Sequence, residues 1–469
     1  MPLMKHTKKP IQLFGKSLLT TAALLACATQ ARAQSADVLI DKLVEKGILS
    51  VREAQDLREE ADKNFTAAVQ SKLGMPDWVS GYKISGDVRA RYDHISSENE
   101  GFAARERYRY RLRFGITVNM FDNLEAGFRL ASGDAKGSAG NPLSANSTMQ
   151  DNFSKKSIYI DTAYGKWTPV NSGGWQLSTT VGKMENPFTF TPMVFDPDLT
   201  PEGAAVQANW AINDQHSVSF TGAGFVLDEE QSLASDPAMV GAQVVWTGKW
   251  NEKFSTTLGA GTFKITSTEQ LTSANVPYVN QGNTRYITQA PVTGADLYSL
   301  KYGYFPAILN GSATYTLDSF PFYNGAFPIK ASAEFMQNLA TSANNQGFWI
   351  GVTLGKSGTK KTWDLTYRYE RLESDAWYDQ LVDDDNGAFY PGDQQTGTAG
   401  SIPFGYYGGT NVKGHMVKFN YSFTDSFTFT ATCFINDLIS ADSLVANGLV
   451  PDNKTSAAFH FMADVMWKF

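Results

Sequence analysis

Polar and apolar residues alternate most clearly between Arg105 and Val118, a stretch that reads R-E-R-Y-R-Y-R-L-R-F-G-I-T-V. Every odd position from 105 to 113 is Arg, and the even positions from 108 to 118 are Tyr, Tyr, Leu, Phe, Ile and Val. Because successive side chains of a strand point to opposite faces, one face is charged and the other apolar. The five arginines span roughly 27 Å at about 3.4 Å per residue, close to the hydrocarbon thickness of a bilayer. The pattern predicts a strand between lipid and a water-filled lumen.

Similar alternation recurs in sixteen segments from Trp78 to the C-terminus, each with apolar residues at every second position or nearly so. The sixth and tenth are the weakest. Their approximate spans are 80–92, 106–119, 124–131, 156–167, 175–184, 203–212, 217–227, 239–249, 254–265, 302–317, 328–337, 347–355, 362–371, 414–423, 427–436 and 458–469. An even number of such strands predicts an all-β fold, a transmembrane antiparallel up-and-down β-barrel of about 16 strands. Eighteen strands remain an alternative, because the segment 266–301 is long enough to contain a hairpin.

The connections between these segments also alternate in length. Short polar turns occur at 121–123, 213–215, 251–253 and 424–426, and long loops rich in Gly, Asn, Asp and Ser occur at 131–155, 184–202, 266–301 and 372–413. Short turns on the periplasmic side and long loops outside are typical of outer-membrane barrels. A soluble β-sandwich or β-propeller also has many strands, but it does not need an apolar aromatic outer face.

The N-terminal 76 residues differ from the rest of the chain. Residues 1–33 have a basic start, an apolar core at 17–28 and a small-x-small site at Ala31-Arg32-Ala33, which predicts a cleaved signal peptide and export. A lipoprotein signal ending at Cys27 is the alternative. Residues 34–76 predict a periplasmic helical segment, with a capping box that begins at Ser50; a mobile spacer or lumen plug is the alternative. The barrel then occupies residues 77–469.

Composition and charge narrow the function. No apolar run reaches the ~18 residues of a membrane helix. Without residues 1–33 the chain has 35 basic and 47 acidic residues, a formal charge of −12 that argues against nucleic acid as a partner. The four histidines left after cleavage have no metal-ligand spacing, and no nucleophile motif is present. We therefore expect no catalytic residue, metal or cofactor, and His94 is the one candidate participant in any hydrolase chemistry.

Three stretches resemble a family of bacterial outer-membrane putative porins, related to the general porin superfamily. They are LIDKLVEKGIL at 39–49, GKMENPF at 182–188 continuing to FDPDLTPEG at 195–203, and the C-terminal strand that ends in Phe469. The resemblance implies passive diffusion of small hydrophilic solutes, often through a homotrimer. It also implies that the barrel-assembly machinery reads the last strand, whose alternate residues are Phe461, Val465, Trp467 and Phe469.

The candidate selectivity site combines wall arginines with loop acids. The predicted lumen wall carries Arg89, Arg91, Arg107, Arg109, Arg111, Arg113 and Arg129. In sixteen-stranded porins the third outer loop folds inward, and here that loop is 184–202, with the acids Glu185, Asp196, Asp198 and Glu202. Acids facing bases would create a transverse field that sorts ions and orients dipolar solutes. The arginines could instead be solvated, or paired with Asp87 and Glu125 across the strands.

The sequence thus predicts an outer-membrane porin with a wet, charged and anion-biased pore, in contact with lipids and lipopolysaccharide. A channel selective for phosphate, carboxylates or sugars is one alternative, since arginine suits anions and stacked aromatics suit sugars. A non-conducting adhesin or envelope anchor is the other. The acidic runs at 228–230 and 383–385 are interpreted as solvated faces of outer loops rather than cation sites. Solute identity, pore diameter and oligomeric state are not set by the sequence.

Overall fold

The computed structural model describes residues 42, 44–46, 50, 53–55, 57, 76–98, 104–136, 139–229, 235–278, 281–289, 294, 296–388, 409–440 and 457–469. The chain divides into two compact units, Met1–Ser80 and Gly81–Phe469. The expected signal peptide lies outside the described residues, as does most of the expected helical segment. In that segment the backbone N–H of Ser50 donates to Glu53 Oε2 (2.8 Å) and that of Glu53 donates to Ser50 Oγ (3.3 Å), which is the predicted capping box.

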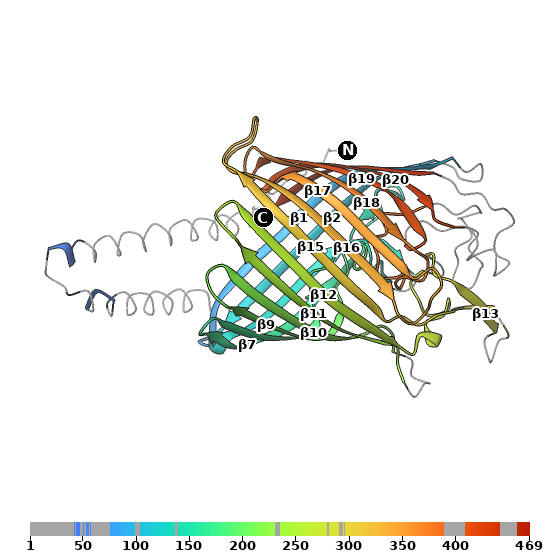
Figure 1. Cartoon of the computed structure of the whole chain (residues 1–469), viewed down its shortest axis with the longest axis horizontal. Coiled ribbons are helices and arrows are strands. Elements are labelled where there is room, and N and C mark those ends of the chain that lie inside the picture. Colours follow the sequence, from blue (N-terminus) through green and yellow to red (C-terminus); the bar gives the residue numbers. More distant parts are fainter. Residues whose placement is uncertain are drawn as a thin grey trace, which may run out of the picture. The chain divides into compact units, whose positions relative to one another are not determined.

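The second unit is a closed antiparallel β-barrel (Figure 1), whose described residues form sixteen long strands. Strand β21 pairs with β1, and β1 also pairs with β2, which closes the sheet. The strands are β1 (Val79–Ser97), β2 (Arg105–Met120), β3 (Leu124–Ser132), β7 (Ile158–Ser172), β8 (Trp175–Lys183), β9 (Glu202–Ala211), β10 (His216–Val226), β11 (Ala238–Lys249), β12 (Phe254–Thr266), β15 (Pro306–Leu317), β16 (Phe327–Asn338), β17 (Gln346–Gly355), β18 (Thr362–Leu372), β19 (Val412–Thr424), β20 (Phe427–Leu438) and β21 (Ala458–Lys468). The predicted fold and number of strands are confirmed.

The remaining short elements lie in the loops and turns. They are the 3₁₀ turns η1 (Phe121–Asn123) and η2 (Thr268–Gln270) and the short strands β4 (Ala135–Lys136), β5 (Ala139–Gly140), β6 (Ser147–Thr148), β13 (Arg285–Gln289) and β14 (Asp296–Leu300). The segment 266–301 does contain a hairpin, but β13 pairs with β14 in a separate two-stranded sheet. The eighteen-strand alternative is therefore wrong. No helix among the described residues is long and apolar enough to cross a membrane.

Strand β2 has the two predicted faces. Tyr108 is 61% exposed and Phe114 39% exposed on the outer face, whereas Arg109 and Arg111 are each only 6% exposed on the inner face. Strand β18 repeats the arrangement, with Tyr367 outside and the buried Arg368 inside. A large contiguous face of exposed apolar side chains is unusual in a protein surrounded by water and is typical of a surface that contacts lipid. The exposures follow from apolar residues that face hydrocarbon and charged residues that face the lumen.

Two long loops fold into the barrel and pack together on a shared core. We call residues 184–201 the first inner loop and residues 373–388 the second inner loop. Thr189 and Thr191 of the first inner loop hydrogen-bond to Gln243 on β11 and Glu334 on β16, both of which are buried on the inner face of the wall. The core joins both loops to the wall through fully or nearly fully buried side chains, including Met184, Phe188, Met193, Val194, Phe195, Phe225, Met239, Phe263, Tyr304, Trp377 and Tyr378. The barrel-strand residues of this core come from β9 to β12, β15, β16 and β18 to β20, and none of the described core residues belongs to β1, β2 or β3.

Candidate functional site

A basic wall covers three neighbouring strands. Alternation along β1, β2 and β3 directs to the lumen the seven arginines that the sequence singled out. The wall consists of Arg89, Arg91, Arg107, Arg109, Arg111, Arg113 and Arg129. Four of the seven come from β2 alone, because its odd positions are all Arg from 105 to 113 and all but the outermost of these lie on the inner face. The predicted ladder is therefore present as a continuous patch.

Carboxylates on β1 and on its neighbour β21 pair with much of this wall. Arg91 binds Asp464 on β21 through two parallel bonds, Nε–Oδ1 at 2.8 Å and NH2–Oδ2 at 3.0 Å. Arg111 lies 2.8 Å from Asp87 on β1. Asp93, also on β1, accepts a hydrogen bond from Arg107 at 2.6 Å and from His460 at 2.9 Å.

Arg109 lies 3.5 Å from the Asp93 carboxylate. The pairing across strands that the sequence left open thus holds for Asp87. It does not hold for Glu125, which accepts a hydrogen bond from Tyr164 at 2.8 Å.

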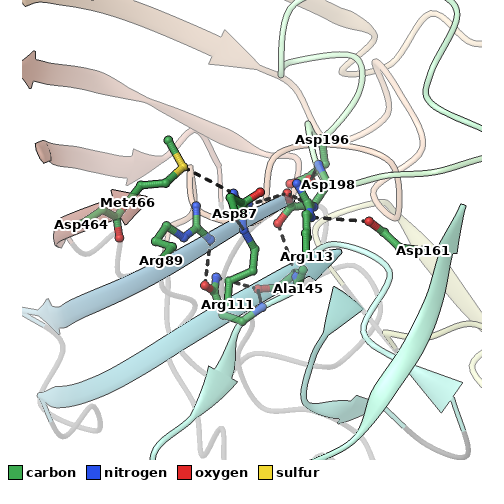
Figure 2. Close-up of polar contacts among 12 residues, drawn as sticks. Asp87, Arg89, Arg111, Arg113, Ala145, Asp161, Asp196, Asp198, Asp464 and Met466 are labelled. Atoms are coloured by element: carbon green, nitrogen blue, oxygen red, sulfur yellow. Dashed lines mark hydrogen bonds and ion pairs between the residues drawn. The ribbon is translucent and has the colours of Figure 1, made fainter. Parts of the chain in front are cut away.

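The first inner loop brings one acid directly against the ladder. Asp198 Oδ1 lies 2.8 Å from Arg113 NH2 and 3.6 Å from Arg111 NH1, and Figure 2 shows both guanidinium groups directed at it. Asp196 is buried beside Asp198 and accepts a hydrogen bond from the Asp198 backbone N–H at 2.6 Å. Asp198 therefore contacts Arg113 and Arg111 directly and is not separated from them by an open water-filled pore.

The two other predicted loop acids lie at the ends of the loop. Glu185 pairs with Arg129, which also pairs with Asp161 on β7. Glu202 pairs with Lys183 at 2.8 Å, across the β8–β9 register, and contacts none of the seven wall arginines in the described residues. Glu202 therefore lies where the first inner loop joins β9 and is not part of the charged wall.

The interpretation of 383–385 as a solvated outer face is wrong. These three aspartates form the tip of the second inner loop, where Asp385 lies 3.3 Å from Arg91 and Asp383 lies 3.6 Å from Arg368. The tip is held against the first inner loop, because the Asp383 N–H donates to Pro192 O at 3.1 Å. Sequence reasoning missed this because nothing local distinguishes an acidic loop tip in water from one that is folded inward.

The electrostatic environment separates the loop carboxyls into two groups. Burial raises the pKa of Asp198, but the charges of Arg113 and Arg111 outweigh it and lower the pKa below the usual range. For Asp196, burial and the neighbouring Asp384 raise the pKa well above the usual range. Burial and Asp385 do the same to the pKa of Asp384. The arginines thus stabilise the ionised form of Asp198, whereas burial and like charges disfavour ionisation of Asp196 and Asp384.

One group of carboxylates has the spacing that a metal ion would need. Asp196, Asp383 and Asp384 each place an oxygen within 4.8 Å of the others, the one such set in the described part of the chain. A hard cation such as Ca²⁺ takes six to eight oxygen ligands in proteins. Three acidic oxygens without further ligands do not make such a site, so we assign no metal to it.

A cavity of about 490 Å³ lies between the wall and the inner loops. It has seven basic and six acidic residues in its lining: Arg89, Arg91, Arg111, Arg113, Arg368, Lys418, Lys468, Asp196, Asp198, Asp383, Asp384, Asp385 and Asp464. Its volume is within the range of roughly 300–1,000 Å³ of small-molecule sites. Arg368, Lys418 and Asp464 were not predicted as site residues, although inward alternation on β18, β19 and β21 was the signal that could have found them.

The C-terminal strand joins the first one at the barrel seam. Trp467 and Phe469 are 45% and 58% exposed, and Met462 and Asp464 between the outward positions are buried. Phe469 and Gly86 exchange backbone hydrogen bonds of 2.9 and 3.0 Å. The alternation predicted for this strand is therefore present. His94 lies 3.6 Å from Glu106.

These observations together define a transmembrane β-barrel of the porin type, with sixteen long strands among the described residues, an apolar outer face and a charged lumen. Residues 98–293 match a family model described as putative porin, which confirms the resemblance that the sequence showed. The solved structures with similar folds include OprB of Pseudomonas putida, at 11% identity over 83% of this chain and 94% of that chain, with a TM-score of 0.49. They also include a mutant porin of Rhodopseudomonas blastica, at 10% identity over 83% of this chain and 100% of that chain, with a TM-score of 0.39. No curated protein matches the chain.

Proposed function

We propose that the protein carries small hydrophilic solutes and ions across the outer membrane by passive diffusion, through a lumen bounded on one side by the arginine ladder. The observation that carries this proposal is the charged cavity between the wall and the inner loops. In a closed barrel with an apolar outer face, charged side chains on the inner face are typical of a lumen that is filled with water. The solute gradient supplies the driving force.

A modest anion preference follows from the balance of charge in this cavity. Seven basic side chains line it against six acidic ones, and two of those acids, Asp196 and Asp384, have raised pKa values. The preference is modest because most wall arginines have a carboxylate within 4.0 Å, which cancels most of their field in a wet lumen.

Planar-bilayer recording tests both parts of the proposal. We expect discrete open steps from the purified protein and a reversal potential in a KCl gradient that favours chloride. The double variant Arg109→Gln, Arg111→Gln should shift that potential towards cations, because it removes two wall charges and leaves Asp93 and Asp87 with fewer partners. Lys253→Gln, at an exposed turn, is the matched control. An unchanged reversal potential in the double variant would refute the role of the ladder.

A non-conducting envelope anchor remains the second candidate, because the packed core of the inner loops fills part of the lumen. The same recording separates the two functions. A complete lack of open steps, in protein that is folded and inserted, would favour the anchor.

We further propose that residues 1–33 are cleaved on export, that the barrel-assembly machinery reads the strand ending in Phe469, and that the barrel works as a homotrimer among lipids and lipopolysaccharide. The outward alternation of β21 supports the second point. Mass spectrometry of the mature chain and its oligomer in detergent would test the cleavage site and the trimer directly.

A further inference from the structure

Three basic groups in the cavity are not paired with acids. Among the described residues, no carboxylate lies within 4.0 Å of Arg89, Lys418 or Lys468, although all three line the cavity. Arg89 donates one hydrogen bond, from NH2 to Asn146 Oδ1 at 2.7 Å, and its buried Nε has no acceptor. Every other predicted wall arginine has a carboxylate partner. The positive charge of Arg89, unlike that of its neighbours, is therefore not neutralised by a carboxylate of the described residues and is available to an anionic group of a solute.

Two acids that line the same cavity are unpaired in the same sense. No basic nitrogen of the described residues lies within 4.0 Å of the Asp196 or Asp384 carboxylate. Asp196 is only 4% exposed, and its oxygens accept only backbone N–H groups, from Asp198 at 2.6 Å and Asp384 at 3.4 Å. The unpaired acids belong to the inner loops, and the unpaired bases belong to β1, β19 and β21 of the wall.

We propose that this cavity binds a small zwitterion such as an α-amino acid, with its carboxylate at Arg89 and its ammonium group at Asp384 and Asp196. The proposal rests on the channel function above and adds the class of solute. Unpaired groups of opposite charge in the lining of one cavity match a solute that has both charges. A simple anion satisfies only the wall, and a cation satisfies only the loops.

The acids alone do not indicate a zwitterion, because a metal cation could also bind them. The unpaired bases line the same cavity, and a metal cation at the loops would leave these bases without a counter-charge. Burial and the neighbouring acids raise the pKa of Asp196 and of Asp384 in the empty pore, and an ammonium group beside them would lower both pKa values by supplying a positive charge, so that its binding is coupled to their ionisation.

Liposome swelling with two isomers tests the proposal. L-alanine and lactamide have the same atoms and nearly the same size, but only alanine is a zwitterion at neutral pH. We expect alanine to enter wild-type proteoliposomes about fivefold faster than lactamide, the factor that corresponds to ~1 kcal/mol. The ratio should fall towards one in Arg89→Gln and also in Asp384→Asn. Lys253→Gln, outside the cavity, should keep the wild-type ratio.

The outcomes separate this proposal from the channel function. Equal swelling in both isomers would overturn the zwitterion site and leave the channel intact. A ratio that falls in Arg89→Gln but not in Asp384→Asn would also overturn it, because it would indicate a site for the carboxylate alone. No swelling with either isomer, together with no open steps in a bilayer, would instead refute the channel function.

Discussion

Replacement of Trp377 by Ala should widen the pore without unfolding the barrel. Trp377 is fully buried at the centre of the inner-loop core, with its ring centroid 5.4 Å from that of Phe263 and 6.2 Å from that of Tyr304. Its indole N–H donates to Val194 O at 2.8 Å, so the same side chain ties the second inner loop to the first. The barrel strands are held by their own hydrogen-bonded register, which does not involve this residue.

The cost follows from the burial and the hydrogen bond. Truncation of a buried Trp to Ala typically costs 3–5 kcal/mol, and the lost hydrogen bond adds about 1 kcal/mol. At ~1.4 kcal/mol per tenfold, a loss of about 4 kcal/mol raises the open population of the loops by roughly a thousandfold. Loops open locally at lower free energies than the structure that carries them. We therefore expect the loops to leave the lumen while the wall persists.

Single-channel conductance and sugar exclusion measure this opening. Trp377→Ala should give larger and noisier open steps and should admit larger oligosaccharides in liposome swelling. Trp377→Phe keeps the ring packing without the N–H and should lie close to wild type. Heat-modifiable migration in gels checks that the barrel is intact. If folded Trp377→Ala protein keeps the wild-type conductance and exclusion size, the inner loops do not restrict the pore and the reasoning is wrong.

Two further predictions concern the barrel seam and the pH response. A Cβ added at Gly86 would clash with the backbone oxygen of Arg113 and stand 2.5 Å from the Phe469 ring, so Gly86→Ala should destabilise the barrel by about 1–3 kcal/mol and reduce the folded fraction in heat-modifiability gels. Gly81→Ala, where nothing lies within 4 Å, is the control, and equal folding of the two variants would contradict the role of the seam. The raised pKa values of Asp196 and Asp384 mean that these acids are protonated below about pH 4 and ionise only as the pH rises through the raised values. The anion preference should therefore be largest at low pH and decline as the pH rises, and Asp384→Asn should flatten that decline in reversal-potential titrations. If the variant keeps the full decline, other titrating groups cause the pH dependence.

The strands could be predicted because each one carries its own evidence. In a segment such as Arg105–Met120, alternation over sixteen residues indicates one face towards lipid and one towards water. The same alternation, found in sixteen segments, gives the number of strands. The hairpin β13–β14 shows the limit of the rule. The segment is long enough for two more barrel strands, but the hairpin pairs with itself and contacts the second inner loop, where Arg285 lies 3.1 Å from Asp379.

The partners of the ladder could not be predicted because they are remote in the chain. Arg91 meets Asp385 and Asp464, which are 294 and 373 residues away. Alternation states which face a side chain occupies, but it contains no information about which strand or loop is opposite. For the same reason the run at 383–385 looked like a solvated loop, although the buried Trp377 and Leu381 nearby in the same segment carry it into the lumen.

The pairing of the ladder changes which residues could decide selectivity. A charge removed from bulk water is costly unless it is paired and hydrogen-bonded, and most wall arginines meet that requirement with carboxylates of the protein itself. A paired guanidinium offers a passing solute little net field. The many arginines therefore indicate a hydrated and rigid wall more than they indicate a preference of the pore for anions. Specificity falls to the cavity charges that have no partner of opposite sign among the described residues, because these gain a partner when a solute enters. They are Arg89, Lys418 and Lys468 on the wall and Asp196 and Asp384 on the loops.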